Sequence, residues 1–223
     1  MCIRDRIKVE APSGYGLDNR FMYALNKFEN FKRPCGGGDI EACENVKRVI
    51  LDWAKADAAK RTGPSNHEGR HWNDTLTVNL WVASPMMAAY SFAKQIIKVP
   101  DNEDKIIKDW FERIVKKNKH LMYGMTYKQG TQAIGVPKRA HNHALSSAIA
   151  HMELGILLND NTQFRKAFKN YEAAIKYQRG DGSLPIETRR GGRAMFYQAR
   201  AMNALAAVSY THLRAHETRG NIV

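Results

Sequence analysis

Cysteine is scarce in this sequence: three residues in 223 are too few for a scaffold built on disulfides. No apolar run approaches the ~20 residues that an α-helix needs to span a bilayer, so we expect no membrane segment. Acidic residues are also few, because 22 Asp and Glu stand against 35 Lys and Arg, which gives a formal charge of +13. This charge imbalance predicts an anionic partner without saying which one.

Apolar residues, in contrast, are plentiful. They make up 43% of the chain and include four Trp, nine Tyr and eight Phe, which predicts a folded core. The two ends differ from the interior: residues 1–6 and 209–223 resemble translated adaptor sequence, and we expect them to be non-native. We therefore expect one domain over residues 7–208, truncated at both ends.

The interior is typical of an all-α protein, because no segment shows the alternation of a strand. Segments that are apolar all round alternate with amphipathic ones, which favours two layers of helices. A proline, Pro85, should kink or interrupt the second of the helices that we expect. These helices cover residues 39–60, with Asp39 as a possible N-cap, and 76–98, 102–119, 141–158, 162–178 and 190–208.

The last of these segments carries the most informative side chains. Arg190, Arg193 and Tyr197 have the spacing i, i+3, i+7, which on one continuous helix puts them on one face within ~10.5 Å along the axis. Arginines on a mostly buried helix need an anion, an acidic side chain or water. The alternative to a binding site is a pair of structural salt bridges, for example with Glu187, beside a tyrosine of the core.

A second cluster, His141, Asn142 and His143, stands where a helix is expected to begin. Helix N-termini present free backbone N–H groups and a positive dipole end, which suit a carboxylate. The alternative is an Asn N-cap beside two exposed histidines. A zinc site is disfavoured, because His141 and His143 point apart at a spacing of i, i+2.

Two further features are weaker. Residues 62–74 form a loop rich in His, Arg and Trp, and such loops either contact ligands or are ordinary surface. Two cysteines, Cys35 and Cys43, flank three glycines that could bring them together. An exported protein would bridge them, whereas a cytosolic one would not.

Together these segments resemble the alginate lyase family of polysaccharide lyases, over residues 39–208. The resemblance is carried by Asn142-His143 and by the motif DGSLPIE at residues 181–187, followed by Arg190, Arg193-Ala194 and Tyr197. The sequence departs from the family pattern in three places: His141 replaces an Asn, Ala144 and Leu145 stand where the family has aromatic residues, and Gln198 replaces a His. These departures leave open which uronate polymer is preferred, with glucuronan or a mixed polyuronate as alternatives to alginate.

The resemblance implies an incomplete (α/α) toroid of antiparallel helical hairpins that cleaves polyuronates, above all mannuronate-rich alginate, by β-elimination. It implies that Asn142 and Arg190, helped by His143, neutralise the substrate carboxylate, with Tyr197 as acid and base and His143 as the alternative base. It also implies an anionic polysaccharide as partner, no cofactor or metal, and a periplasmic or secreted location. The residues that we expect to bind substrate are Arg193, His141, and from the loop His67, Arg70, Trp72 and Asn73.

Two functions of other classes remain open from the residues themselves. A basic helical module that binds nucleic acid would share the charge and the helices, but it needs Lys and Arg along an exposed face. We do not favour it, because the informative arginines lie on the most apolar segment. The other alternative is a toroid that binds polyanions without cleaving them.

Overall fold

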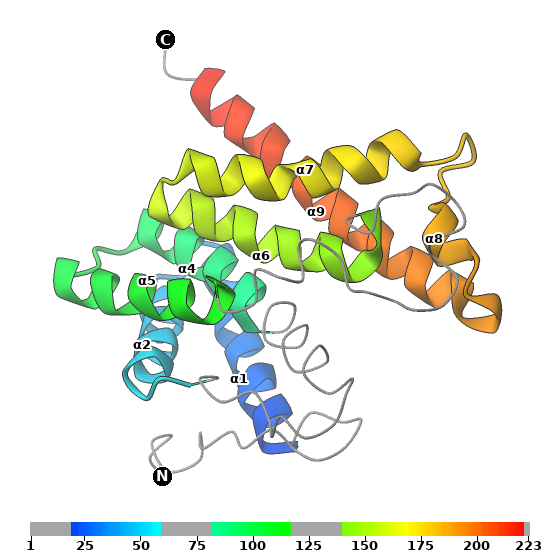
Figure 1. Ribbon diagram of the computed structural model, residues 1–223. Helices are drawn as coiled ribbons and strands as arrows, with labels where there is room; N and C mark the ends of the chain where they lie inside the picture. Colours follow the sequence, from blue (N-terminus) through cyan, green and yellow to red (C-terminus); the bar gives the residue numbers. More distant parts are fainter. Residues whose placement is uncertain (1–18, 59–81, 117–139, 221–223) are drawn as a thin grey trace. The chain divides into compact units, whose positions relative to one another are not determined.

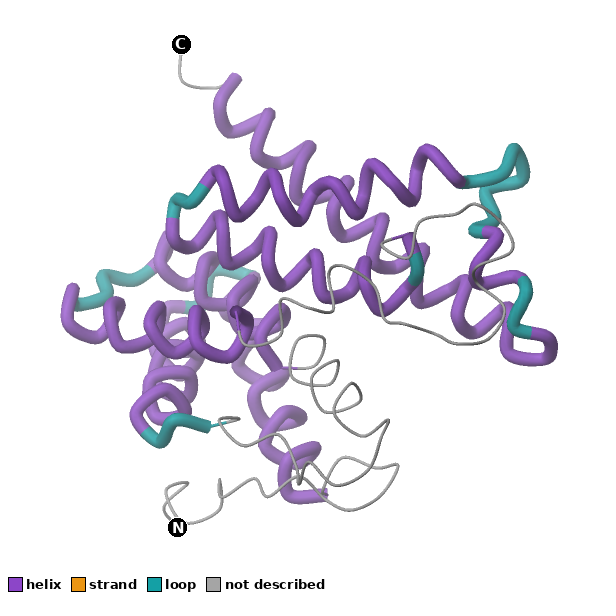
Figure 2. The backbone as a smooth tube through the Cα atoms, in the orientation of Figure 1, coloured by secondary structure: helices purple, strands orange, loops and turns teal. Residues whose placement is uncertain are grey.

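The computed structural model describes residues 19–58, 82–116 and 140–220, and every regular element in these ranges is helical (Figures 1 and 2). The chain divides into two compact units, one over Met1–Asn118 with Leu157–Asn159 and one over Lys119–Ile156 with Asp160–Val223. None of the described helices is both long and apolar enough to cross a membrane. The boundaries 7–208 and the non-native ends stay predictions.

In the first unit, α2 packs against each of the three other helices that the structure describes there. Its apolar residues recur at spacings of three and four, so Val46, Ile50 and Trp53 share one buried face. The expected N-cap is present, because Asp39 accepts a hydrogen bond from the Ala42 N–H at 2.9 Å. The described α-helices of this unit are α1 (Asn19–Gly36), α2 (Ile40–Lys55), α4 (Ser84–Ile96) and α5 (Asp101–Lys116).

A disulfide joins the end of α1 to the start of α2. Cys35 and Cys43 are bonded with an S–S length of 2.05 Å. The turn between them passes through Gly38 at φ 92°, a conformation that L side chains rarely adopt and that glycine adopts without strain. Of the two alternatives left open by the sequence, the structure has the bridged one.

The helices α4 and α5 form an antiparallel hairpin organised by one carboxylate. Asp104 accepts hydrogen bonds from the Tyr90 hydroxyl and the Lys94 ammonium, both at 2.7 Å, and pairs with Lys108. Pro85 lies in the first turn of α4, where a helix has no need of the missing N–H. Directly before α4, Val82 and Ala83 are π-helical, so the helical type changes next to the proline. Residues 76–81 of the expected helix lie outside the described residues, and the expected kink or interruption at Pro85 stays a prediction.

The second unit is built from α6 (Asn142–Leu158), α7 (Asn161–Tyr177), the short α8 (Pro185–Thr188), a 3₁₀ turn η6 (Gly191–Arg193) and α9 (Ala194–Gly220). Helices α6 and α7 lie side by side and antiparallel (Figure 1). Their contacts give this direction, because Ala144 receives a hydrogen bond from Asn170 while His151, further along α6, bonds the earlier residue Gln163.

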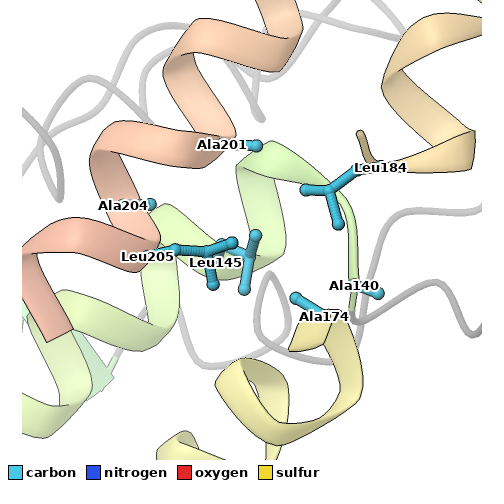
Figure 3. Packing of buried hydrophobic residues seen from close by; sticks show 7 residues of the cluster. All are labelled: Ala140, Leu145, Ala174, Leu184, Ala201, Ala204 and Leu205. Carbon is cyan, nitrogen blue, oxygen red and sulfur yellow. The ribbon is translucent and has the colours of Figure 1, made fainter. Parts of the chain in front are cut away.

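Helix α9 runs parallel to α6, and the two enclose the core of this unit with α7. Leu145, near the start of α6, packs with Ala201 and Leu205, in the cluster that Figure 3 shows. Met152, two turns later, packs with Val208. The helices α6 and α7 thus form an antiparallel hairpin, and α9 repeats the direction of α6. This arrangement is the repeating unit of a two-layer helical array, which the alternation of apolar and amphipathic segments predicted.

Candidate active site

The start of α6 is capped by a histidine side chain. His141 accepts hydrogen bonds through Nδ1 from the backbone N–H groups of His143, at 3.0 Å, and Ala144, at 3.4 Å. An accepting Nδ1 places the ring proton of neutral His141 on Nε2. Burial, together with the positive charge of Arg190, lowers the pKa of His141 to about 4. The cap is thus His141 and not Asn142, and the two histidines are buried, each with 6% of its surface exposed.

Asn142 follows the cap and is held by a carboxylate from a distant part of the chain. Its backbone N–H donates to Oε1 of Glu187 at 2.7 Å, and both residues are buried. Its side-chain oxygen Oδ1 is buried near the His141 ring and makes no hydrogen bond of normal geometry within the described ranges. A buried amide oxygen in this state is suited to a donor from a ligand.

The same carboxylate holds the first of the two arginines. Arg190 Nε lies 3.0 Å from Oε2 of Glu187, so the structural salt bridge that we considered as an alternative does form. Arg190 also covers Tyr197, with the guanidinium carbon 4.1 Å from the ring centroid. A cation this close to an aromatic face is attracted to it and orders both groups.

The helical geometry that we predicted for these residues is wrong in one respect. Helix α9 begins at Ala194, and Arg190 stands before the 3₁₀ turn at Gly191–Arg193. The cause is the Gly191-Gly192 pair, because glycine disfavours helix and Gly191 has a φ of 56°. Arg190 reaches Tyr197 by folding back over the turn, whereas Arg193 lies on the exposed surface.

His143 is the second neutral imidazole of the site. Burial and the neighbouring groups His141, Arg190 and Arg200 lower its pKa to about 3. The two histidine rings meet edge to face, with centroids 5.4 Å apart. Arg200, half-buried on α9 with its guanidinium carbon 4.6 Å from the Phe196 ring centroid, is therefore a second cation near the site, beside Arg190.

Sequence reasoning missed Arg200, although its position suggested a role. It lies three residues after Tyr197, one turn along the same helix. It also treated Glu187 only as a salt-bridge partner and overlooked Asn170, which anchors the first turn of α6 by donating to the Ala144 carbonyl at 3.2 Å.

Gln198, one of the departures from the family pattern, has a structural role. Its Oε1 accepts from the Leu184 N–H at 3.0 Å, and its Nε2 donates to the Gly182 carbonyl at 3.3 Å. Both bonds tie α9 to the connection that carries Glu187. The amide side chain therefore fixes the placement of the motif at residues 181–187.

The remaining expected site residues cannot be placed. His67, Arg70, Trp72 and Asn73 lie outside the described residues. Within the described ranges, no group of three or more His, Cys, Asp and Glu side chains could hold a metal ion. The second unit does bring together the phenol of Tyr197, two guanidiniums, two neutral imidazoles and Asn142. Arg190 covers the Tyr197 ring, its charge lowers the pKa of both His141 and His143, and Arg200 also acts on His143.

Comparison with known proteins places the chain in a family. The model of the alginate lyase family matches residues 7–217, so the chain belongs to that family. Curated alginate lyases of Pseudomonas syringae pv. syringae and Cobetia marina are each 25% identical over 176 residues, and one of Pseudomonas aeruginosa (strain LESB58) is 25% identical over 188 residues. These alignments cover 77%, 77% and 80% of this chain but only 42%, 42% and 44% of the relatives.

The chain also shares its fold with solved structures. Alginate lyase A1-III from Sphingomonas species A1 aligns with a TM-score of 0.65 at 17% identity, over 92% of this chain and 56% of that one. A variant of A1-III complexed with a tetrasaccharide aligns with a TM-score of 0.68 at 18% identity, over 94% of this chain and 63% of that one. This likeness confirms the predicted fold class, the all-α (α/α) toroid of helical hairpins.

Proposed function

We propose that this chain carries the catalytic centre of a polyuronate lyase that cleaves mannuronate-rich alginate by β-elimination. One observation carries the proposal: the guanidinium of Arg190 covers the phenol of Tyr197 and is at the same time fixed by the Glu187 carboxylate that holds Asn142. The arrangement brings a carboxylate receptor to an acid–base group, which is what elimination from a uronate requires.

The first requirement of the reaction is to make the C5 proton of the uronate acidic. Removing this proton shifts negative charge onto the C6 carboxylate, so groups that neutralise the carboxylate stabilise the transition state. Arg190 supplies positive charge, and Asn142 supplies an amide at the capped start of a helix, where the dipole also favours an anion. These two residues are the proposed neutralising groups, with His143 beside them.

The second requirement is a pair of proton transfers. A base takes the C5 proton, the C4–O4 bond breaks as the C4–C5 double bond forms, and an acid protonates the departing O4. Where both groups lie on one side of the sugar ring, as in mannuronate, Tyr197 performs both transfers. Where they lie on opposite sides, His143 takes the proton and Tyr197 donates to O4.

The lowered pKa of His143 is compatible with this second role. Without substrate, the nearby arginine charges oppose protonation of the ring, and burial does so even more. A bound uronate carboxylate partly cancels those positive charges and so raises the pKa of His143. The histidine thus becomes a better base when the substrate arrives than it is in the empty site.

We also propose that the wider cationic surface guides the polymer. Arg193 is exposed at the end of the 3₁₀ turn and is suited to a neighbouring carboxylate, and we assign the loop residues His67, Arg70, Trp72 and Asn73 to the same role. A periplasmic or secreted location is supported by the Cys35–Cys43 disulfide, since such bonds persist in oxidising compartments.

The direct test is incubation of the 223-residue chain with separate polymers of mannuronate, guluronate and glucuronate. We expect the absorbance of the unsaturated product to rise fastest with polymannuronate. Faster cleavage of glucuronan would reassign the substrate but keep the reaction. Salt-sensitive binding of these polymers without any cleavage would leave only a polyanion-binding protein, and preferential binding of DNA or RNA would favour the nucleic-acid module.

A further inference from the structure

The carboxylate of Glu187 is the most completely enclosed charged group of the second unit's described residues. Its side chain has no exposed surface, and it sits on the short helix α8. Oε1 accepts the Asn142 N–H at 2.7 Å and Oε2 meets Arg190 Nε at 3.0 Å. One side chain therefore joins the capped start of α6 to the turn that precedes α9.

We propose that Glu187 is a positioning residue of the proposed lyase: it holds Asn142 and Arg190 at a fixed separation, so that both can meet the same uronate carboxylate. This inference rests on the proposed function. It assigns Glu187 no contact with the substrate, because both of its oxygens engage groups of the protein.

The chemistry of the two partners explains why a carboxylate is needed. The Asn142 N–H is a donor, and the Arg190 guanidinium is a cation that pairs with Oε2 by charge at 3.0 Å, without the geometry of a hydrogen bond, so the side chain between them must offer an acceptor atom and a negative charge. An ionised carboxyl group offers both, whereas the amide of glutamine is uncharged and has one acceptor oxygen and one donor nitrogen. With glutamine at this position, only one of the two contacts can be kept.

The direction of Arg190 depends on this contact. Glu187 engages the planar guanidinium from its Nε side, while the Tyr197 ring supports one face of the plane at 4.1 Å. These two contacts, from different directions, fix the guanidinium plane of Arg190 and so the direction of its terminal nitrogens. The recognition of a carboxylate by a guanidinium depends on that direction. A small rotation of this plane would misplace the receptor for the substrate carboxylate.

Stability alone does not account for a charged group at this place. Burial raises the pKa of Glu187 above its usual value, although the Asn142 N–H and the Arg190 charge act in the opposite direction. The enclosure is thus unfavourable to the ionised form, and apolar residues of similar volume often replace buried ion pairs without loss of stability. A role in arranging the site gives a reason for the ionised group.

The first test compares Glu187→Gln with Glu172→Gln, the same chemical change on an exposed position of α7. We expect kcat of Glu187→Gln to fall ~10- to 100-fold while KM for the polymer changes less than about threefold, and both constants of Glu172→Gln to stay unchanged. If Glu187→Gln does not fold by circular dichroism, Glu187→Asp, which keeps two acceptors on a shorter stem, should fold and show the same split. Wild-type kcat in the folded variant overturns the proposal.

The second test is a double-mutant cycle with Arg190→Ala. Because Glu187 is inferred to act through Arg190, Glu187→Gln should cost less than about threefold in kcat once Arg190 is gone. Full additivity of the two losses would show a merely structural effect and overturn the positioning role. If the wild-type chain cleaves no uronate polymer, the proposed function fails and this role with it; if the wild type is active and Glu187→Gln equally active, only the role fails.

Discussion

Arg190 and Tyr197 are stacked, with the guanidinium carbon 4.1 Å from the centroid of the phenol ring. The stack crosses a break in secondary structure, because Arg190 precedes a 3₁₀ turn and Tyr197 lies in the first turn of α9. The turn thus brings the proposed carboxylate receptor directly against the proposed proton donor. Three predictions below concern this site, and a fourth concerns the disulfide of the first unit.

Replacing Tyr197 by phenylalanine should abolish cleavage. The variant keeps the ring that Arg190 covers but loses the hydroxyl, so neither proton transfer can occur and kcat should fall by at least ~10³-fold. The rate is measured as absorbance of the unsaturated product, and folding by thermal unfolding. Tyr177→Phe on α7 is the matched control and should keep full activity. A Tyr197→Phe variant with wild-type turnover would remove the phenol from the mechanism.

The two arginines should differ in what they contribute. Arg190→Ala should lower kcat more than it weakens polymer binding, since its charge acts on the carboxylate as the proton leaves. Arg193→Ala should raise KM and leave kcat within about twofold, because the exposed side chain can serve only as an anchor. Steady-state kinetics separates these effects, with Arg165→Ala on the exposed side of α7 as control. Equal effects of both substitutions on KM alone would contradict the assignment.

The two site histidines should remain neutral across the physiological range. With pKa values of about 4 for His141 and about 3 for His143, neither ring should titrate between pH 5.5 and 8 by NMR. In the unfolded chain both bind a proton near the ordinary pKa of about 6.5. Below that value the unfolded state holds more protons, so the free energy of unfolding should fall as the pH falls from about 6.5 toward 4.

Urea unfolding at pH 7 and pH 5 measures this loss. A His141→Asn, His143→Gln double variant, which keeps an acceptor at the cap, should lose less stability between the two pH values than the wild type. An equal loss in both proteins would assign the pH dependence to other groups.

Removing the disulfide should destabilise the first unit. The Cys35–Cys43 bond closes a short loop, for which the loss of chain entropy in the unfolded state corresponds to about 2–3 kcal/mol. The Cys35→Ala, Cys43→Ala double variant should show this decrease in the free energy of unfolding by urea titration. Reductant should reproduce the decrease in the wild type and have no effect on the variant. Cys2→Ser is the control and should behave as wild type.

Periodicity in the sequence was enough to locate helices whose apolar residues form one regular stripe. For α2, both the buried face and the Asp39 cap followed from the residues alone. Helix α1 was not among the predicted elements, although it is described over Asn19–Gly36. The start of the last helix was placed four residues too early, because a face drawn at 100° per residue takes no account of the Gly191-Gly192 pair.

The resemblance to the family was enough to name most residues of the candidate site. The contacts among these residues could be found only from the structure. Nothing in the sequence indicates that a histidine caps α6, since histidine is not a preferred N-cap residue. The bridge from Glu187 to Asn142 spans 45 positions, a separation that no local pattern can report. The spacing of Arg200 from Tyr197 put both on one face of α9, but its effect on the pKa of His143 depends on the packing of α9 against α6, which the spacing does not give.

Parallel packing of α6 and α9 has a consequence for how such a protein can change. The proposed reacting groups His143 and Tyr197 lie in the opening turns of the two helices, whereas Met152 and Val208, in later turns, pack in the interior. If the proposed site is correct, substitutions that alter which sugar acid is accepted and substitutions that alter heat resistance fall on separate stretches of the same two helices.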